Sequence, residues 1–416
     1  MSRTVVVIGA GAAGMMAAHF AAQNGARVIL LEKNKKPCRK VMITGKGRCN
    51  VTNNSSPDNI ISKTPTNGRF LYSAVSFFTP QDTMDFFEAA GVDLKTERGN
   101  RVFPCSDKAA DIVDALLQTV KKDGCTILTE KQAQSLIIDG DRISGVRLTD
   151  GEAVKADRVI IACGGASYPR TGSTGDGYGL AKQAGHTIKD IKPSLVPIEC
   201  KGDMCAKLQG LSLKNVNFSV YFKNGKKPVF TELGELIFTH FGLSGPLVLS
   251  ASSHMKKGDI EDYGFFIDLK PGLDIDALDK RLMRDFEEFC NKDFSNSLGK
   301  LLPSKLIPVI IEMSGIPAAE KCNSITKQQR RQLAELLKKL PIAPLRFRPI
   351  DEAIITSGGV STKEINPKTM ESKLVGGLYF AGEVIDVDAY TGGYNLQIAF
   401  STGALAGRGC ELDDFD

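Results

Sequence analysis

The 416-residue sequence lacks several features that would place it in a specialised class. Its ten cysteines are irregularly spaced and no CxxC occurs, which argues against a zinc site or a disulfide framework. No run of about 18 apolar residues exists, so we expect neither a membrane span nor export. The formal net charge is only +5, which slightly favours an anionic ligand and does not by itself argue for nucleic acid. These absences predict a cytoplasmic protein with free thiols and no metal site.

The first 32 residues carry the strongest pattern. A β-branched run over 4–8 predicts a buried strand, a glycine-rich turn covers 9–14, and a helix and a second strand lead to an acid. The glycines permit a tight turn, phosphate approach and close helix packing, and the acid can accept from a ribose hydroxyl. This order predicts a dinucleotide-binding unit with phosphates at the helix N-terminus. Its expected contacts are Gly9, Gly11, Ala12, Ala13, Gly14 and Glu32.

A segment rich in Lys, Arg, Gly and Asn, residues 33–54, follows that acid. Its poor periodicity predicts an extended loop that starts beside the cofactor. Basic side chains and glycine N–H groups suit a pyrophosphate or an electron-rich ring, whereas a solvated basic loop is the alternative. The candidate contacts here are Lys33, Arg39, Lys40, Thr44, Gly45, Gly47, Arg48, Cys49 and Asn50.

Three later strands follow, of which the strand at 158–165 is predicted to lie beside the first strand and the strand at 351–360 to run back toward the first domain. Residues 158–165 form an apolar strand with a glycine tip, residues 351–360 a further strand, and residues 377–383 a strand with an acidic tip. A Gly-Gly pair then opens a helix to about residue 406. A late acid followed by a helix N-terminus favours FAD over NAD, because these groups can contact the ribityl chain and the reduced ring. The candidate contacts are Ala133 near the adenine, then Ala162, Gly164, Gly165, Asp176, Gly382, Glu383, Gly392, Gly393, Tyr394, Asn395, Leu396 and Gln397.

The middle of the chain differs in composition. Residues 196–270 are strand-rich and residues 271–344 are helical, so we expect an insert at 196–344. The FAD-binding domain would then comprise residues 1–195 and 345–416. Residues 321–348 contain eight basic residues and one acid, which suits either a solvated helix face or an RNA-facing patch.

With these motifs in place, the chain resembles the BaiN-like, or aminoacetone-oxidase-like, FAD-dependent oxidoreductases, also called YhiN-like. The resemblance covers nearly the whole chain. It implies an α/β fold, in which an FAD-binding Rossmann-like domain of the GR2 type carries an inserted β-barrel-like and helical domain, as in fumarate-reductase-type flavoproteins. It also implies that residues 44–50 pass by a non-covalent flavin. The motifs that carry it are the first glycine turn and residues 43–50, 239–246, 356–360 and 382–397.

The resemblance does not fix one reaction. Some members are linked to oxidation of a small amino ketone, and others to reduction of a C=C bond in a steroid-like bile-acid intermediate. We expect an FAD-dependent reductase of a small molecule. NAD(P)H would be a transient donor, because only one dinucleotide fold is visible. An oxidase, a flavoprotein acting on RNA and an electron carrier are the alternatives. Candidate catalytic residues, by position alone, are Arg48, His240 and Tyr394.

Overall fold

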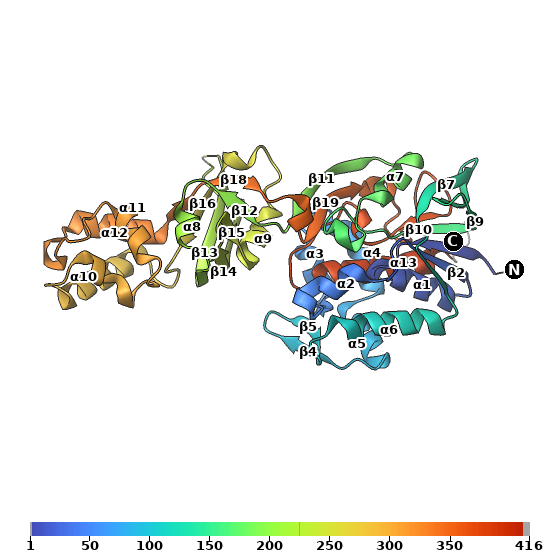
Figure 1. Ribbon diagram of the computed structural model, residues 1–416, viewed down its shortest axis with the longest axis horizontal. Coiled ribbons are helices and arrows are strands. Elements are labelled where there is room, and N and C mark those ends of the chain that lie inside the picture. Colours follow the sequence, from blue (N-terminus) through green and yellow to red (C-terminus); the bar gives the residue numbers. More distant parts are fainter. Residues whose placement is uncertain (1, 224, 411–416) are drawn as a thin grey trace. The chain divides into compact units, whose positions relative to one another are not determined.

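The computed structural model describes residues 2–223 and 225–410, which divide into two compact units (Figure 1). The first unit takes in the described residues up to Ser194 and from Pro349 onward, and the second comprises Leu195–Arg348. Each unit has a hydrophobic core of its own. Within the described ranges, no helix combines the length and the apolar character needed to cross a bilayer.

A five-stranded sheet of the order β20-β10-β1-β2-β6 forms the centre of the first unit. All its neighbouring strands pair in parallel, and Ile8 at the end of β1 pairs with both Leu31 and Ile161. The carboxyl ends of the strands therefore meet at one edge. The expected parallel sheet is confirmed: strand 158–161 lies beside the first strand, and strand 378–380 pairs with the other side of strand 158–161. Its strands are β1 (Thr4–Ile8), β2 (Arg27–Glu32), β6 (Thr126–Thr129), β10 (Arg158–Ile161) and β20 (Leu378–Phe380).

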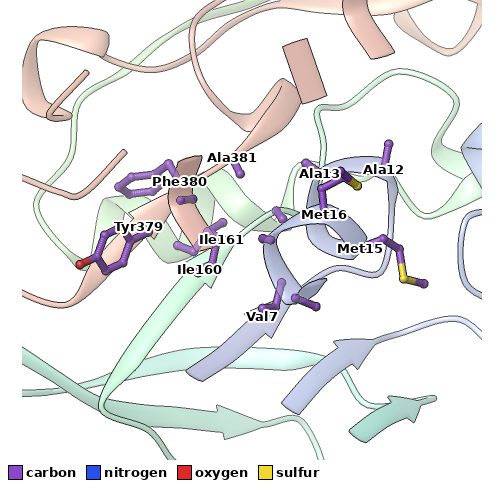
Figure 2. Close-up of a cluster of buried hydrophobic side chains, with 14 of the residues drawn as sticks. Val7, Ala12, Ala13, Met15, Met16, Ile160, Ile161, Tyr379, Phe380 and Ala381 are labelled. Atoms are coloured by element: carbon purple, nitrogen blue, oxygen red, sulfur yellow. The ribbon is translucent and has the colours of Figure 1, made fainter. Parts of the chain in front are cut away.

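Two helices rich in small residues, α1 (Ala12–Gln23) and α13 (Tyr394–Gly409), pack closely against each other. A Cβ at Gly403 would lie 2.3 Å from the Ala13 carbonyl oxygen, so only glycine allows this approach. Figure 2 shows side chains of β1, α1, β10 and β20 that meet in the core beneath the edge of the sheet.

The other elements of the first unit surround this centre. The remaining strands form three small antiparallel sheets, β3-β5-β4, β7-β8-β9 and β11-β19. They are β3 (Thr52–Asn53), β4 (Leu94–Glu97), β5 (Arg101–Pro104), β7 (Ala133–Asp139), β8 (Arg142–Leu148), β9 (Ala153–Lys155), β11 (Ile188–Ser194) and β19 (Ile355–Val360). The remaining α-helices are α2 (Arg39–Ile43), α3 (Pro57–Ser62), α4 (Tyr72–Phe77), α5 (Pro80–Ala89), α6 (Ala109–Lys122) and α7 (Asp176–Gln183).

Two expectations for this unit are corrected. The segment 33–54 is not one extended loop, because it contains α2, a 3₁₀ turn over Thr44–Gly47 and the short strand β3. The strand expected from residue 351 begins at Ile355, since Ile350–Glu352 forms a 3₁₀ turn first.

The second unit combines a seven-stranded antiparallel sheet with helices. The sheet order is β17-β16-β13-β14-β15-β12-β18. Its strands are β12 (Ile198–Cys200), β13 (Ser212–Phe222), β14 (Phe230–Phe238), β15 (Gly242–Ser244), β16 (Tyr263–Asp268), β17 (Leu340–Ile342) and β18 (Pro344–Phe347). Its α-helices are α8 (Met204–Lys207), α9 (Pro246–Ser252), α10 (Ile275–Glu288), α11 (Ile307–Ser314) and α12 (Lys327–Lys338).

Candidate functional site

A pocket opens at the carboxyl edge of the parallel sheet, within the first unit. Such an edge is where ligands bind in open α/β sheets. The pocket brings together many predicted residues from distant parts of the chain, namely Gly9, Gly11, Ala12, Ala13, Glu32, Lys33, Arg39, Lys40, Thr44, Ala133, Ala162, Gly164, Asp176, Gly382, Glu383, Asn395 and Leu396.

The N-terminus of α1 supplies backbone donors to this pocket. Gly11 is its N-cap residue, and no side chain caps the helix. A Cβ at Gly11 would meet nothing within 4 Å, whereas one at Gly14 would lie 1.8 Å from the Gly9 carbonyl oxygen. Gly14 therefore permits the strand–helix contact, and Gly11 leaves the space in front of the helix open. Unpaired N–H groups beside open space form a cradle for phosphate.

Glu32, at the end of β2, presents a buried carboxylate to the pocket. Its Oε2 accepts from the Ala10 backbone N–H at 3.1 Å. Its Oε1 accepts from the backbone and side-chain nitrogens of Asn34, at 2.8 and 2.6 Å. The carboxylate is thus fixed in orientation and retains acceptor capacity for a hydroxyl pair such as that of a ribose.

Lys33 and Asp176 form an ion pair in the pocket lining. The Lys33 ammonium lies 2.7 Å from Asp176 Oδ2 and also contacts Thr174. Burial opposes ionisation of Asp176, but hydrogen bonds from Lys33 and Thr174 outweigh burial and lower the pKa of that carboxyl. The pair positions the start of α7 against the end of β2.

A second ion pair joins α2 to the residues after β20. Lys40 Nζ lies 2.6 Å from Glu383 Oε2 and 2.8 Å from Ser167 Oγ. Glu383 Oε1 accepts from Ser167 Oγ at 3.0 Å and from the Thr356 N–H at 2.8 Å. The ion pair of Lys40 and Glu383, whose residues both line the pocket, is therefore held in position by contacts among four separate segments.

Burial suppresses ionisation of the thiols near the pocket. Burial raises the pKa of both Cys49 and Cys163 to about 12, and burial also raises the pKa of Cys38, with Glu32 contributing. A thiol with so high a pKa stays protonated at neutral pH. Among the described residues, moreover, no group of three or more His, Cys, Asp or Glu could hold a metal ion.

Several predicted residues are outside the pocket lining, namely Gly14, Gly45, Gly47, Arg48, Cys49, Asn50, Gly165, His240, Gly392, Gly393, Tyr394 and Gln397. Arg48 instead binds Glu97 and Asp107 and stacks 4.1 Å over the Phe103 ring. His240 belongs to the second unit, where its ring contacts that of Phe241.

Gln397 has a structural role in place of the expected cofactor contact. Its Oε1 accepts from the hydroxyls of Thr52 and Thr83, at 2.5 and 2.8 Å. Its Nε2 donates to the Phe78 carbonyl and to Ser401, at 3.0 and 2.9 Å. The buried amide therefore ties α13 to β3 and α5 and has no capacity left for a ligand.

The structure adds lining residues that sequence reasoning missed. Asn34 and Cys38 lie within the basic segment, where no local spacing distinguished them. Lys131 and Gln132 immediately precede Ala133, so the expected adenine contact could have signalled them. The others are Ile8, Ala10, Leu31, Val41, Cys163, Thr171, Gly172, Ser173, Leu180, Ile354, Ile355, Ala381, Val387, Ile398 and Ala399.

The basic stretch in the second unit is largely neutralised. Six of its eight basic side chains contact carboxylates, so the structure favours a solvated, ion-paired face over a cationic patch. These six are Lys321 with Asp293, Arg330 with Asp279, Arg331 with Asp276, Lys338 with Asp268, and both Arg346 and Arg348 with Glu199.

Comparison with known proteins decides the family. The model of the HI0933-like Rossmann domain matches residues 3–409. The chain belongs to the HI0933-like family. It is 32% identical over 406 residues to the 3-dehydro-bile acid delta(4,6)-reductase of Clostridium scindens, covering 97% of each chain. It is 34% identical over 399 residues to the ribosomal RNA dihydrouridine synthase of Escherichia coli, covering 95% of each.

Solved structures agree on the fold. The 3-ketosteroid delta1-dehydrogenase of Sterolibacterium denitrificans superposes with a TM-score of 0.53 at 14% identity, covering 99% of this chain and 100% of that one. Mycobacterium smegmatis Sdh1 superposes with a TM-score of 0.51 at 18% identity, covering 99% and 68%. The predicted BaiN-like membership and FAD-binding Rossmann fold are thereby confirmed, and this HI0933-like protein is an FAD-dependent oxidoreductase.

The pocket fits FAD on its own chemistry. The open α1 N-terminus suits a pyrophosphate, and the oriented carboxylate of Glu32 suits a ribose. Beyond them the lining continues through Lys40, Glu383 and Leu396, which leaves polar and apolar surface for a ribityl chain and a ring.

Proposed function

We propose that this protein reduces a C=C bond conjugated to a carbonyl group, with NAD(P)H as the electron source. The observation that carries the proposal is that two relatives aligned over nearly their whole length share this chemistry. A delta(4,6)-reductase of a 3-dehydro-bile acid saturates a double bond of an oxo-steroid, and a dihydrouridine synthase saturates the C=C bond of a uracil ring. A steroid-like enone and an RNA uridine are therefore the two candidate substrate classes.

The residues of the pocket would serve this reaction by binding and orientation. FAD supplies the hydride chemistry when it is bound. The α1 N-terminus and Glu32 hold the ADP half, and Gly9 and Gly14 keep that turn in shape. The ion pair of Lys40 and Glu383 carries no net charge, and it would orient a ligand by presenting a fixed donor and a fixed acceptor in the same pocket.

An anaerobic titration of the purified yellow protein tests the proposal. We expect NADH or NADPH to bleach the flavin absorbance. A 3-oxo-delta4 steroid acid or a uridine-containing ribosomal RNA should then restore the absorbance faster than air does. Bleaching by small amines alone, followed by rapid reoxidation in air, would contradict the proposal and support an amine oxidase. Bleaching by NAD(P)H with no reoxidation by either conjugated acceptor would also contradict it.

A further inference from the structure

One helix of the second unit carries basic side chains that remain without an acidic partner in the described part of the chain. Lys280 and Arg284 are both exposed on α10. A spacing of four residues places them on one helix face, about 6 Å apart along the axis. This pair contrasts with the neutralised stretch at 321–348.

The acids of α10 are engaged elsewhere. Asp276 and Asp279 bind Arg331 and Arg330 of α12, and Asp285 binds Arg281. Glu288 binds Lys300, and Glu287 is exposed three residues beyond Arg284. Asp276 and Glu288 lie one helical turn before Lys280 and one turn after Arg284, on the same face, but each is paired with a cation from another segment. With Glu287 as the one remaining acid, this face keeps a small excess of positive charge from Lys280 and Arg284.

These two residues border a groove, hereafter the α10 groove, lined by Leu273, Ala277, Lys280, Arg281, Met283 and Arg284. Met283 is 40% exposed and adds apolar surface between the cations. Lys270 adds charge from the turn before α10. Burial and the charge of Arg281 lower the pKa of the Lys270 ammonium, so positive groups here repel one another. A bound anion would relieve that repulsion.

We propose that the α10 groove binds the phosphodiester backbone of RNA. Two unpaired cations one helical turn apart match neighbouring phosphates of a chain better than they match a single anion, and the exposed Met283 side chain adds apolar surface beside them. The inference rests on the part of the proposed function in which the substrate is a uridine of RNA. The Escherichia coli relative is a ribosomal RNA dihydrouridine synthase, and an enzyme with such a substrate needs a surface that binds RNA.

The test is fluorescence anisotropy of a labelled, unstructured single-stranded RNA with the full-length, FAD-loaded protein, from 50 to 200 mM KCl. The variant K280E/R284E reverses the charge of the α10 groove. The control K214E/K227E makes the same change in net charge at two exposed lysines of the strand-rich part. Equal flavin content and circular dichroism establish that both variants fold.

We expect K280E/R284E to lose roughly tenfold or more in affinity at 50 mM KCl. Its slope of log affinity against log salt should fall by about 1.4, the value for two lost phosphate contacts on a single strand. The control should change affinity by less than about threefold. Equal losses in both variants, no loss in either, or no RNA binding by the wild type would overturn the proposal. Binding of phosphatidylglycerol vesicles with the same loss in K280E/R284E would overturn the assignment to RNA.

Failure of this inference is distinguishable from failure of the proposed function. Flavin reduction by NAD(P)H and reoxidation by a steroid enone need no RNA. If the wild type reduces uridine while K280E/R284E binds RNA normally, the groove is refuted and the function stands. If uridine is never reduced but the RNA-binding defect is present, the groove stands as a binding site.

Discussion

Lys40 and Glu383 are 343 residues apart in the sequence, yet their charged atoms lie 2.6 Å apart in the pocket. The side chains are only 25% and 19% exposed, so solvent screens the pair little. We expect Lys40→Met to lower the free energy of unfolding by about 1–3 kcal/mol, because Glu383 is left without its cation. Urea unfolding of the FAD-loaded protein measures this loss.

The double variant K40M/E383Q provides the control for that pair. It should be more stable than the sum of the two single losses implies, because the two substitutions remove one shared interaction. Strict additivity would show that the contact contributes nothing to stability.

Glu32 is expected to decide retention of the cofactor. Glu32→Ala removes a carboxylate that can accept from the ribose, and the loss of one or two charged hydrogen bonds corresponds to roughly 10- to 100-fold weaker FAD binding. Flavin fluorescence during titration of the FAD-free protein measures it. Glu88→Ala, at an exposed acid of α5, should leave affinity unchanged. Wild-type affinity in the Glu32 variant would refute the assignment.

Substitutions of the two glycines at the start of α1 should have different effects, one on stability and the other on FAD binding. Gly14→Ala places a Cβ 1.8 Å from a backbone oxygen, so the protein should lose at least about 1–3 kcal/mol of stability or not fold. Gly11→Ala meets no atom within 4 Å, so it should fold normally and lose FAD affinity, because its methyl group enters the phosphate cradle. Thermal unfolding and flavin content together separate the two outcomes. Equal behaviour of the variants would contradict this division of roles.

Glu199 should make the second unit sensitive to acid. Hydrogen bonds from Arg346, assisted by Arg348, hold the pKa of its carboxyl below the ordinary value. A lowered folded-state pKa stabilises the fold above the unfolded-state pKa, and the contribution is lost as pH falls through the folded-state pKa. At pH 7, Glu199→Gln should cost about 1 kcal/mol, a modest value because Arg346 is 70% exposed. Denaturant unfolding at pH 7 and pH 3 should show this difference become smaller at pH 3.

An exposed ion pair of the same unit is the matched control. Glu261 binds Lys201, and both side chains are about half exposed. Glu261→Gln should therefore change stability little at either pH. A difference for Glu199→Gln that is as large at pH 3 as at pH 7 would show that charge is not its origin.

Local chemistry made the first βαβ unit predictable. The turn from β1 to α1 depends on which residues can adopt a tight bend within a few positions, and those residues are adjacent in the sequence. The apolar strands ending at Ile161 and Phe380 were recognisable because a buried parallel strand is apolar throughout. In the structure β10 pairs directly with β1, and β20 joins the sheet on the outer side of β10.

Side-chain partnerships were not predictable in the same way. Arg48 stood in a segment with the composition of a phosphate loop, but its carboxylate partners Glu97 and Asp107 lie far along the chain. Gln397 looked like a cofactor contact by its place at a helix start, whereas the threonines that bind it come from β3 and α5. Long-range pairing of this kind is set by packing and leaves no spacing signal in the sequence.

The strands β11 and β19 have a consequence for how this chain could have been assembled. They pair antiparallel, and Ser194, where the chain leaves the first unit, is the register partner of Ile355, shortly after it returns. The two cut points of the 154-residue excursion Leu195–Arg348 are thus anchored side by side, in the way a hairpin anchors the ends of its loop. A gene encoding the flavin domain could therefore gain, lose or exchange this module at one site without redesigning the sheet that binds the cofactor.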